Sequence, residues 1–121
     1  MPDFLFDHIH LFSQEPLKAA EFYEKMGAKQ VSKRDRGNGR YSVNLNLTGT
    51  AIFVSSPADD NAQTGLDHFG IKTNNIEEAV AELKAQGVKF SQEITEVMPG
   101  FKIAFFTGPD NVTVELLEGS G

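Results

Sequence analysis

The feature that most constrains this chain is an internal repeat with an offset of 60 residues. Sliding the sequence by 60 positions places residues 7–11 (DHIHL) on 67–71 (DHFGI), and residues 26–28 (MGA) on 86–88 (QGV). Two copies of one supersecondary unit within 121 residues make a single domain of ordinary size. We predict one domain, 1–121, with a first module at about 4–57, a linker at 58–65 and a second module at about 66–118.

Each module is predicted to contain a strand, a helix and three further strands. In the second module four apolar residues have the spacing of one helical face: Ile76, Ala79, Val80 and Leu83. Asn75 is the expected N-cap of this helix, with Glu78 completing a capping box, and Gly87 the expected residue just beyond its end.

The helix of the first module is predicted from the same spacing in Ala19, Phe22, Tyr23 and Met26, with Pro16 in its first turn and Gly27 at its end. The charged run 33–36 lies beside Gly37-Asn38-Gly39, which favours a solvated turn. The predicted strands cover residues 4–12, 29–33, 41–47 and 50–55, then 66–73, 89–93, 102–106 and 112–117. The fold class is therefore α+β, with two tandem βαβββ modules forming a curved mixed sheet around a cavity.

Strand alternation predicts which side chains face that cavity, because successive strand residues point to opposite faces of a sheet. In the first strand, Ile9 and Leu11 are expected to pack on the helix, which leaves His8, His10 and Phe12 on the other face. The same alternation places Phe53, His68 and Glu115 away from the helices.

Two imidazoles and one carboxylate on converging strands predict a metal site made by His8, His68 and Glu115. This donor set suits one divalent ion, and Fe, Mn, Zn, Ni and Co all accept it. Three protein ligands leave coordination positions open, as catalysis requires. The match of His8 with His68 across the repeat supports the assignment, since only three histidines are present.

Composition excludes several classes of function. Cysteine is absent, so disulfides, thiolate metal sites and cysteine nucleophiles are excluded. The net charge of −6 disfavours binding to nucleic acid or to an anionic membrane. Residues 1–4 lack the pattern of a signal peptide, and no apolar run approaches the roughly 20 residues of a membrane span. We expect a cytoplasmic protein with a small-molecule substrate and no nucleic-acid or membrane partner.

Three segments in order resemble the vicinal-oxygen-chelate superfamily, which includes glyoxalase I, extradiol dioxygenases and bleomycin-resistance proteins. They are the first histidine strand with the helix after it (7–11 and 20–27), the second histidine strand (66–71) and the closing strand (108–117). The resemblance covers essentially the whole chain. It implies a metal-dependent enzyme acting on a substrate with vicinal oxygens, and it implies a homodimer.

The family supplies up to four ligands, and His8, His68 and Glu115 match three of them. The fourth falls at Phe53, which cannot bind a metal, so this chain resembles the three-ligand members in that respect. His10 is the candidate catalytic acid or base. The alternative is a bleomycin-resistance-like protein that binds a small hydrophobic molecule without catalysis, and the candidate pocket residues are Phe12, Phe53, Phe101 and Phe105.

Overall fold

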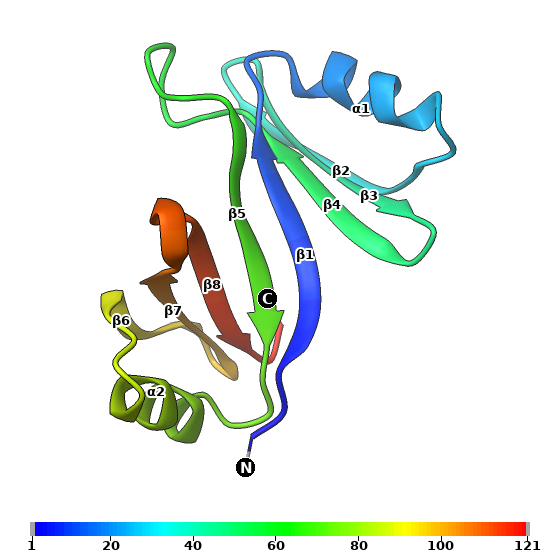
Figure 1. The fold of residues 1–121 in the computed structure, drawn as a ribbon. Coiled ribbons are helices and arrows are strands. Elements are labelled where there is room, and N and C mark those ends of the chain that lie inside the picture. Colours follow the sequence, from blue (N-terminus) through cyan, green and yellow to red (C-terminus); the bar gives the residue numbers. More distant parts are fainter. Residues whose placement is uncertain (1, 121) are drawn as a thin grey trace. The chain divides into compact units, whose positions relative to one another are not determined.

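The computed structural model describes residues 2–120, and these contain the predicted element order twice (Figure 1). The first pass along the chain gives β1 (Leu5–Phe12), α1 (Pro16–Glu24), β2 (Lys29–Gly37), β3 (Arg40–Leu47) and β4 (Thr50–Ser55). The second gives β5 (Gly65–Lys72), α2 (Ile76–Ala85), β6 (Phe90–Met98), β7 (Phe101–Thr107), a single 3-10 turn (Pro109–Asn111) and β8 (Thr113–Glu118). The α+β class and the repeated βαβββ order are thus confirmed.

The chain divides into two compact units. Residues 8–67 form the first unit, and residues 68–120 with residues 2–7 form the second. The division falls at equivalent points of the repeat, between Asp7 and His8 in β1 and between Asp67 and His68 in β5.

Both units contain a mixed four-stranded sheet of the same topology. In the first unit the order is β2-β3-β4-β1, with β1 parallel to β4 and the other neighbours antiparallel. In the second unit the order is β6-β7-β8-β5, and β5 is parallel to β8. The parallel pair brings the start of each unit beside its last strand.

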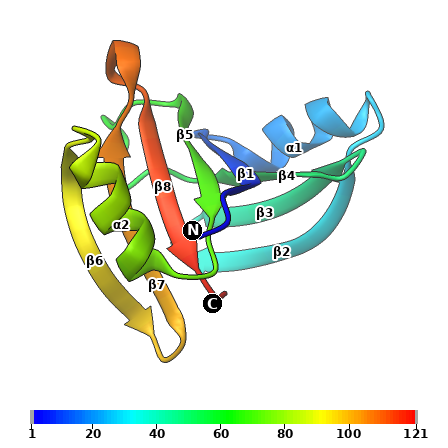
Figure 2. The same cartoon turned by 60° about the horizontal axis from the view of Figure 1, so that its bottom comes forward.

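A helix covers one face of each sheet, and the core lies between them. Helix α1 packs on β3 and β4, and α2 packs on β6 and β8 (Figure 2). Fully buried side chains of the two cores include Val43, Leu45 and Val54 in the first unit and Ile76 and Leu116 in the second. None of the described helices is long and apolar enough to cross a bilayer.

The predicted helix ends are confirmed by their hydrogen bonds. The Asn75 side chain accepts a bond from the Glu78 N–H, which confirms the N-cap. The capping box differs from the predicted one, because the Glu78 carboxylate accepts from the Asn75 side-chain amide while the Asn75 N–H donates to Thr73 Oγ1. Beyond α2, Gly87 has a φ of 94° and its N–H donates to the Lys84 carbonyl, while the Val88 N–H donates to that of Leu83. This is a Schellman ending, in which a positive φ favours glycine.

The buried face of α1 is half of the predicted one. Ala19 and Tyr23 pack against the core as predicted, whereas Phe22 and Met26 are 52% and 55% exposed. Ala20 is buried and Leu17 packs on the core instead, so the face turned toward the sheet is rotated from the predicted one.

The prediction of a turn at residues 33–36 was wrong. Strand β2 runs through this charged segment to Gly37, with every residue exposed. Strand β6 also extends beyond its predicted end at residue 93, to Met98, and is exposed except at Phe90 and Ile94. Both are edge strands with shifts of register, and charged side chains are common at sheet edges because they discourage pairing with other chains.

Candidate metal and substrate site

His8 lies on the face of β1 that is turned away from α1. Its side chain is buried, and its ring stacks on that of Phe53 with centroids 4.4 Å apart and an angle of 22°. Leu11, on the opposite face of the strand, packs against the core. The predicted alternation of β1 is therefore confirmed, and so is that of β4, where Ile52 and Val54 are buried.

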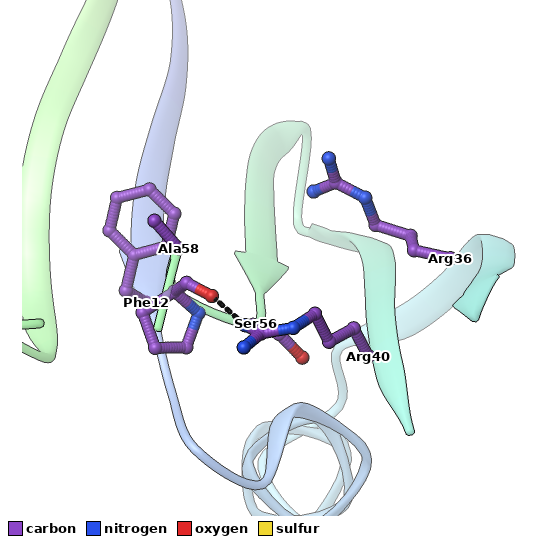
Figure 3. A pocket seen from close by; sticks show the side chains of 6 residues that line it. Phe12, Arg36, Arg40, Ser56 and Ala58 are labelled. Atoms are coloured by element: carbon purple, nitrogen blue, oxygen red, sulfur yellow. Dashed lines mark hydrogen bonds between the residues drawn. The ribbon is translucent and has the colours of Figure 1, made fainter. Parts of the chain in front are cut away.

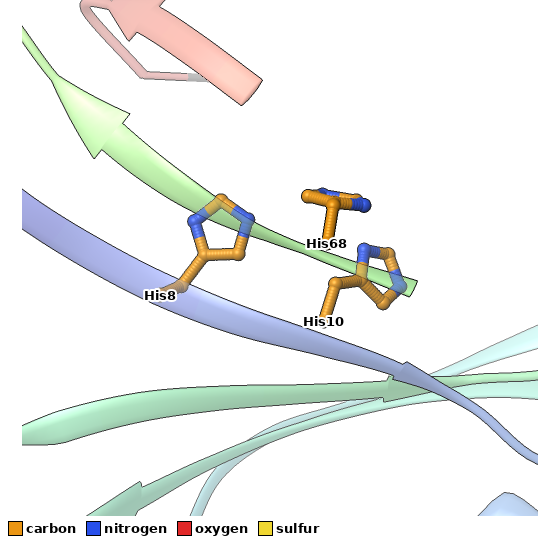
Figure 4. Close-up of side chains that lie close together, drawn as sticks. All are labelled: His8, His10 and His68. Carbon is orange, nitrogen blue, oxygen red and sulfur yellow. The ribbon is translucent and has the colours of Figure 1, made fainter. Parts of the chain in front are cut away.

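His10 follows on the same face of β1. Its Nε2 lies 3.0 Å from Ser55 Oγ, and its ring centroid is 4.8 Å from that of Phe12. Figure 4 shows His8 and His10 projecting from β1, and His68 projecting from β5. The hydrogen bond to Ser55 fixes the orientation of the His10 ring beside Phe53.

His68 and Glu115 form the corresponding pair in the second unit. The Nε2 of His68 lies 3.4 Å from the Oε1 of Glu115, and the two side chains are 8% and 13% exposed. The ring of Phe105 meets the His68 ring edge-on, with centroids 5.6 Å apart. Burying a carboxylate is unfavourable unless a donor or a cation compensates it, so this pair is a suitable place for a cation.

The strand registers define which positions of the two units are equivalent. Phe53 pairs with His10 across the parallel β1 and β4, just as Glu115 pairs with Gly70 across β5 and β8. The side chain at the position of Glu115 is therefore a phenylalanine in the first unit. By the same comparison Asn44, which pairs with Phe53, matches Phe105, which pairs with Glu115.

Asn44 and Ser55 are polar residues of this face that the sequence did not single out. Both are on strands whose alternation is visible in the sequence, but their partners depend on the register between strands. Asn44 is half-buried beside Phe53, and Ser55 is buried beside His10.

The four predicted pocket phenylalanines lie on the open faces of their own sheets. Phe53 contacts His8, and Phe105 contacts His68. Phe101 is half-buried and alternates with Ala104 and Phe106, which pack in the core. Phe12 borders a cavity of about 370 Å³ in the first unit, together with Arg36, Arg40, Ser56, Pro57 and Ala58 (Figure 3).

The donor types present in the two units suit a divalent metal. His8, His10 and His68 each offer a ring nitrogen, and Glu115 adds a carboxylate oxygen. Imidazole and carboxylate are the ligands of Fe(II), Mn(II), Zn(II), Ni(II) and Co(II) in proteins. Burial of His8 and His68 removes competing water from the donors.

Comparison with known proteins finds relatives that are similar in sequence over most of this chain. The chain is 26% identical to a lactoylglutathione lyase of Schizosaccharomyces pombe over 96% of its own length and 45% of that protein. It is 28% identical to the uncharacterized protein YwkD of Bacillus subtilis, covering 92% of this chain and 94% of that one. The chain thus spans under half of the lyase and nearly all of YwkD.

Solved structures share the fold across almost the whole chain. A hypothetical protein of Bacillus halodurans matches with a TM-score of 0.77 and 22% identity, covering 98% of this chain and 96% of that one. Methylmalonyl-CoA epimerase of Mycobacterium tuberculosis matches with a TM-score of 0.72 and 20% identity, covering 96% and 88%.

The sequence model of one family matches residues 5–116, a segment that covers nearly all of both modules and all three predicted metal ligands. The chain belongs to the Glyoxalase/Bleomycin resistance protein/Dioxygenase superfamily.

Proposed function

We propose that this protein is a metal-dependent enzyme in which His8, His68 and Glu115 hold one divalent ion and the substrate binds through two neighbouring oxygens. The observation that carries the proposal is the pair of buried His68 and largely buried Glu115, with side-chain atoms 3.4 Å apart. His8 is buried at the position of the repeat that matches His68. Family membership supports the same role.

A bound divalent metal supplies Lewis-acid stabilisation to negative charge that develops on a substrate oxygen. The chain's own residues bind and orient the substrate. Phe53 and Phe105, stacked on or against the two histidines, are proposed to exclude water from the ligands and to contact the carbon skeleton of the substrate. Water exclusion strengthens electrostatic interactions at the reacting atoms.

His10 is proposed to move a proton or to hold it by hydrogen bonding. Its Nε2 already interacts with the Ser55 hydroxyl, so Ser55 can fix the ring while the other ring nitrogen faces substrate. An imidazole is suited to this task because its unperturbed pKa is near neutrality.

The ligand set and the relatives together support two candidate reaction classes. Lyase or isomerase chemistry is favoured by the likeness to lactoylglutathione lyases. Phe53 provides no proton-transferring group at the position equivalent to Glu115, so His10 would have to supply it. An extradiol-type dioxygenase is the second class, because two histidines and one carboxylate also form the site of non-haem Fe(II) oxygenases.

We further propose that the protein is a homodimer. An apolar hollow of about 340 Å³ lies on the second unit, bordered by Phe69, Ile71, Phe106, Gly108, Pro109, Val112 and Val114. Phe6, 53% exposed, stacks on Phe69 beside it. A surface of this kind is typical of a protein–protein contact.

Metal analysis combined with two assays tests the proposed function. The protein is purified, reconstituted separately with Fe(II), Mn(II), Zn(II), Ni(II) and Co(II), and its metal content measured. Each form is assayed with catechols in air and with hemithioacetals. One metal per chain with turnover in either assay supports the enzyme. Failure to retain any of the five metals, together with tight binding of an aromatic compound, would replace it with a binding protein.

A further inference from the structure

Two arginines border one cavity of the first unit, at the end of the β2–β3 hairpin. Arg36 is the second-last residue of β2 and Arg40 is the first residue of β3, joined by the turn 37–39. Three successive residues of this turn have positive φ values, and the Asp35 carboxylate accepts a hydrogen bond of 2.8 Å from the Gly37 N–H. The tight turn keeps the two guanidinium groups on the same part of the molecule.

Arg36 and Arg40 line the 370 Å³ cavity with Phe12, Ser56, Pro57 and Ala58, called here the arginine cavity (Figure 3). Nη1 of Arg40 donates to the Pro57 carbonyl, and Nη1 of Arg36 donates to Ser42 Oγ at 3.4 Å. Each guanidinium has five N–H donors, so these bonds orient the groups without using their capacity. Within residues 2–120 neither arginine forms an ion pair with a carboxylate.

The position of the cavity connects it with the proposed metal site. Phe12 lies on the same face of β1 as His8 and His10, and its ring contacts that of His10. Phe12 lies four positions after His8, which corresponds to about 13 Å along β1. A molecule bound at His8 would therefore reach the arginine cavity only if it were elongated.

We propose that the arginine cavity binds an oxyanion, a carboxylate or a phosphate, at the end of the substrate remote from the metal. Paired guanidinium groups bind these anions through charge-assisted and bidentate hydrogen bonds. Phe12 would contact the apolar part next to the anion, and the Ser56 hydroxyl, which accepts from the Tyr41 N–H, has its own hydrogen free to donate. The substrate would then be an elongated acid or phosphate ester rather than a neutral compound of a few carbons. That the anion is part of a substrate rests on the proposed function, whereas the presence of an anion site does not.

The anion site is tested on the metal-free protein by NMR titration. The probes are inorganic phosphate, phenyl phosphate and benzoate, with benzyl alcohol as the neutral control. Saturable shifts at Arg36, Arg40 and Ser56 with the anions, and none with benzyl alcohol, are expected. Whichever of phenyl phosphate and benzoate binds with the higher affinity identifies the preferred anion.

Three variants make the result specific. R36Q and R40Q should each weaken anion binding by about tenfold or more, because each removes charge-assisted hydrogen bonds. R34Q removes an exposed arginine of the same strand that does not line the cavity, and should change affinity by less than about twofold. Because Arg40 donates to the Pro57 carbonyl, the Tm of R40Q is compared with that of the parent before its affinity is measured. If R40Q is destabilised, the test relies on R36Q. Equal loss in R34Q and R36Q, or no saturable binding, would overturn the proposal.

The link to the metal is tested on the metal-loaded protein with a hydroxamate, which offers two neighbouring oxygens, joined by a spacer of about 13 Å to a carboxylate. The acid should bind about tenfold more tightly than its methyl ester, and R36Q should remove the difference. Equal affinity of acid and ester would overturn the assignment to the substrate. Because the first titration needs no metal, absence of metal binding would contradict the proposed function and leave the anion site intact.

Discussion

The ring of Phe53 stacks on the ring of His8 in the first unit, whereas the equivalent position of the second unit places the Glu115 carboxylate 3.4 Å from His68. The two halves of the repeat thus combine their histidine with different neighbours. An aromatic ring shields an imidazole from water, and a carboxylate adds a ligand. In the proposed site this difference would leave one coordination position without a protein ligand.

Replacement of Phe53 by glutamate should restore the fourth ligand. We expect Phe53→Glu to tighten metal binding by about tenfold or more and to reduce the native activity, because a position for substrate is lost. Weak proton-transfer activity on hemithioacetals is also expected, since a carboxylate beside a metal can act as a base. Affinity is measured by competition with a chelator of known strength.

Phe53→Leu is the matched control for this experiment, since it removes the ring without adding a donor. It should leave metal affinity within about threefold of the parent. Unchanged affinity in a folded Phe53→Glu protein would show that this side chain does not face the metal.

Strand alternation explains why much of the site could be predicted from the sequence. A period of two separates core from open face wherever one face is covered by a helix, so the orientations of His8, Phe53 and Glu115 followed from their neighbours. The match of His8 with His68 needed only the repeat. The helix caps at Asn75 and Gly87 were equally local, because each depends on a few adjacent residues.

Features that depend on contacts between distant segments were missed. The exposed position of Phe22 and Met26 depends on how α1 lies on its sheet, which the apolar spacing leaves open. The arginine cavity requires the exact register of the β2–β3 hairpin and the return of residues 56–58 beside it. In the sequence Arg36 and Arg40 merely flank a glycine-rich turn, a position where arginine is usually solvated.

The assembly prediction concerns the apolar hollow of the second unit. Sedimentation equilibrium at micromolar concentration should give the mass of a dimer, and Val112→Glu, at the edge of the hollow, should shift the protein to monomers. Val97→Glu is the control, because Val97 is 50% exposed and lies outside the hollow. A parent protein that sediments as a monomer would contradict the dimer.

Gly119 should be far less tolerant of substitution than Gly27, although both have positive φ values of 81° and 101°. An added Cβ at Gly119 would lie 1.9 Å from the Gly100 carbonyl oxygen, whereas nothing lies within 4 Å at Gly27. Gly27→Ala should lower the free energy of unfolding by about 1–2 kcal/mol through backbone strain alone. Gly119→Ala should lower it further, since backbone atoms must move. If chemical denaturation gives the two variants the same loss of unfolding free energy, the backbone at the end of β8 can move to accept the added Cβ.

The proposed ligand assignment has a direct alternative, because His10 also offers a ring nitrogen. Alanine at His8, His68 or Glu115 should weaken metal binding by about a hundredfold or more while the far-UV circular dichroism stays that of the parent. His10→Ala should keep the metal and lose turnover, since its proposed role is proton transfer. If His10→Ala loses the metal and Glu115→Ala retains it, the ion is held by three histidines and Glu115 is a hydrogen-bonding partner of His68. If His8→Ala, His68→Ala and Glu115→Ala all bind metal as tightly as the parent, the proposed metal site would have to be withdrawn.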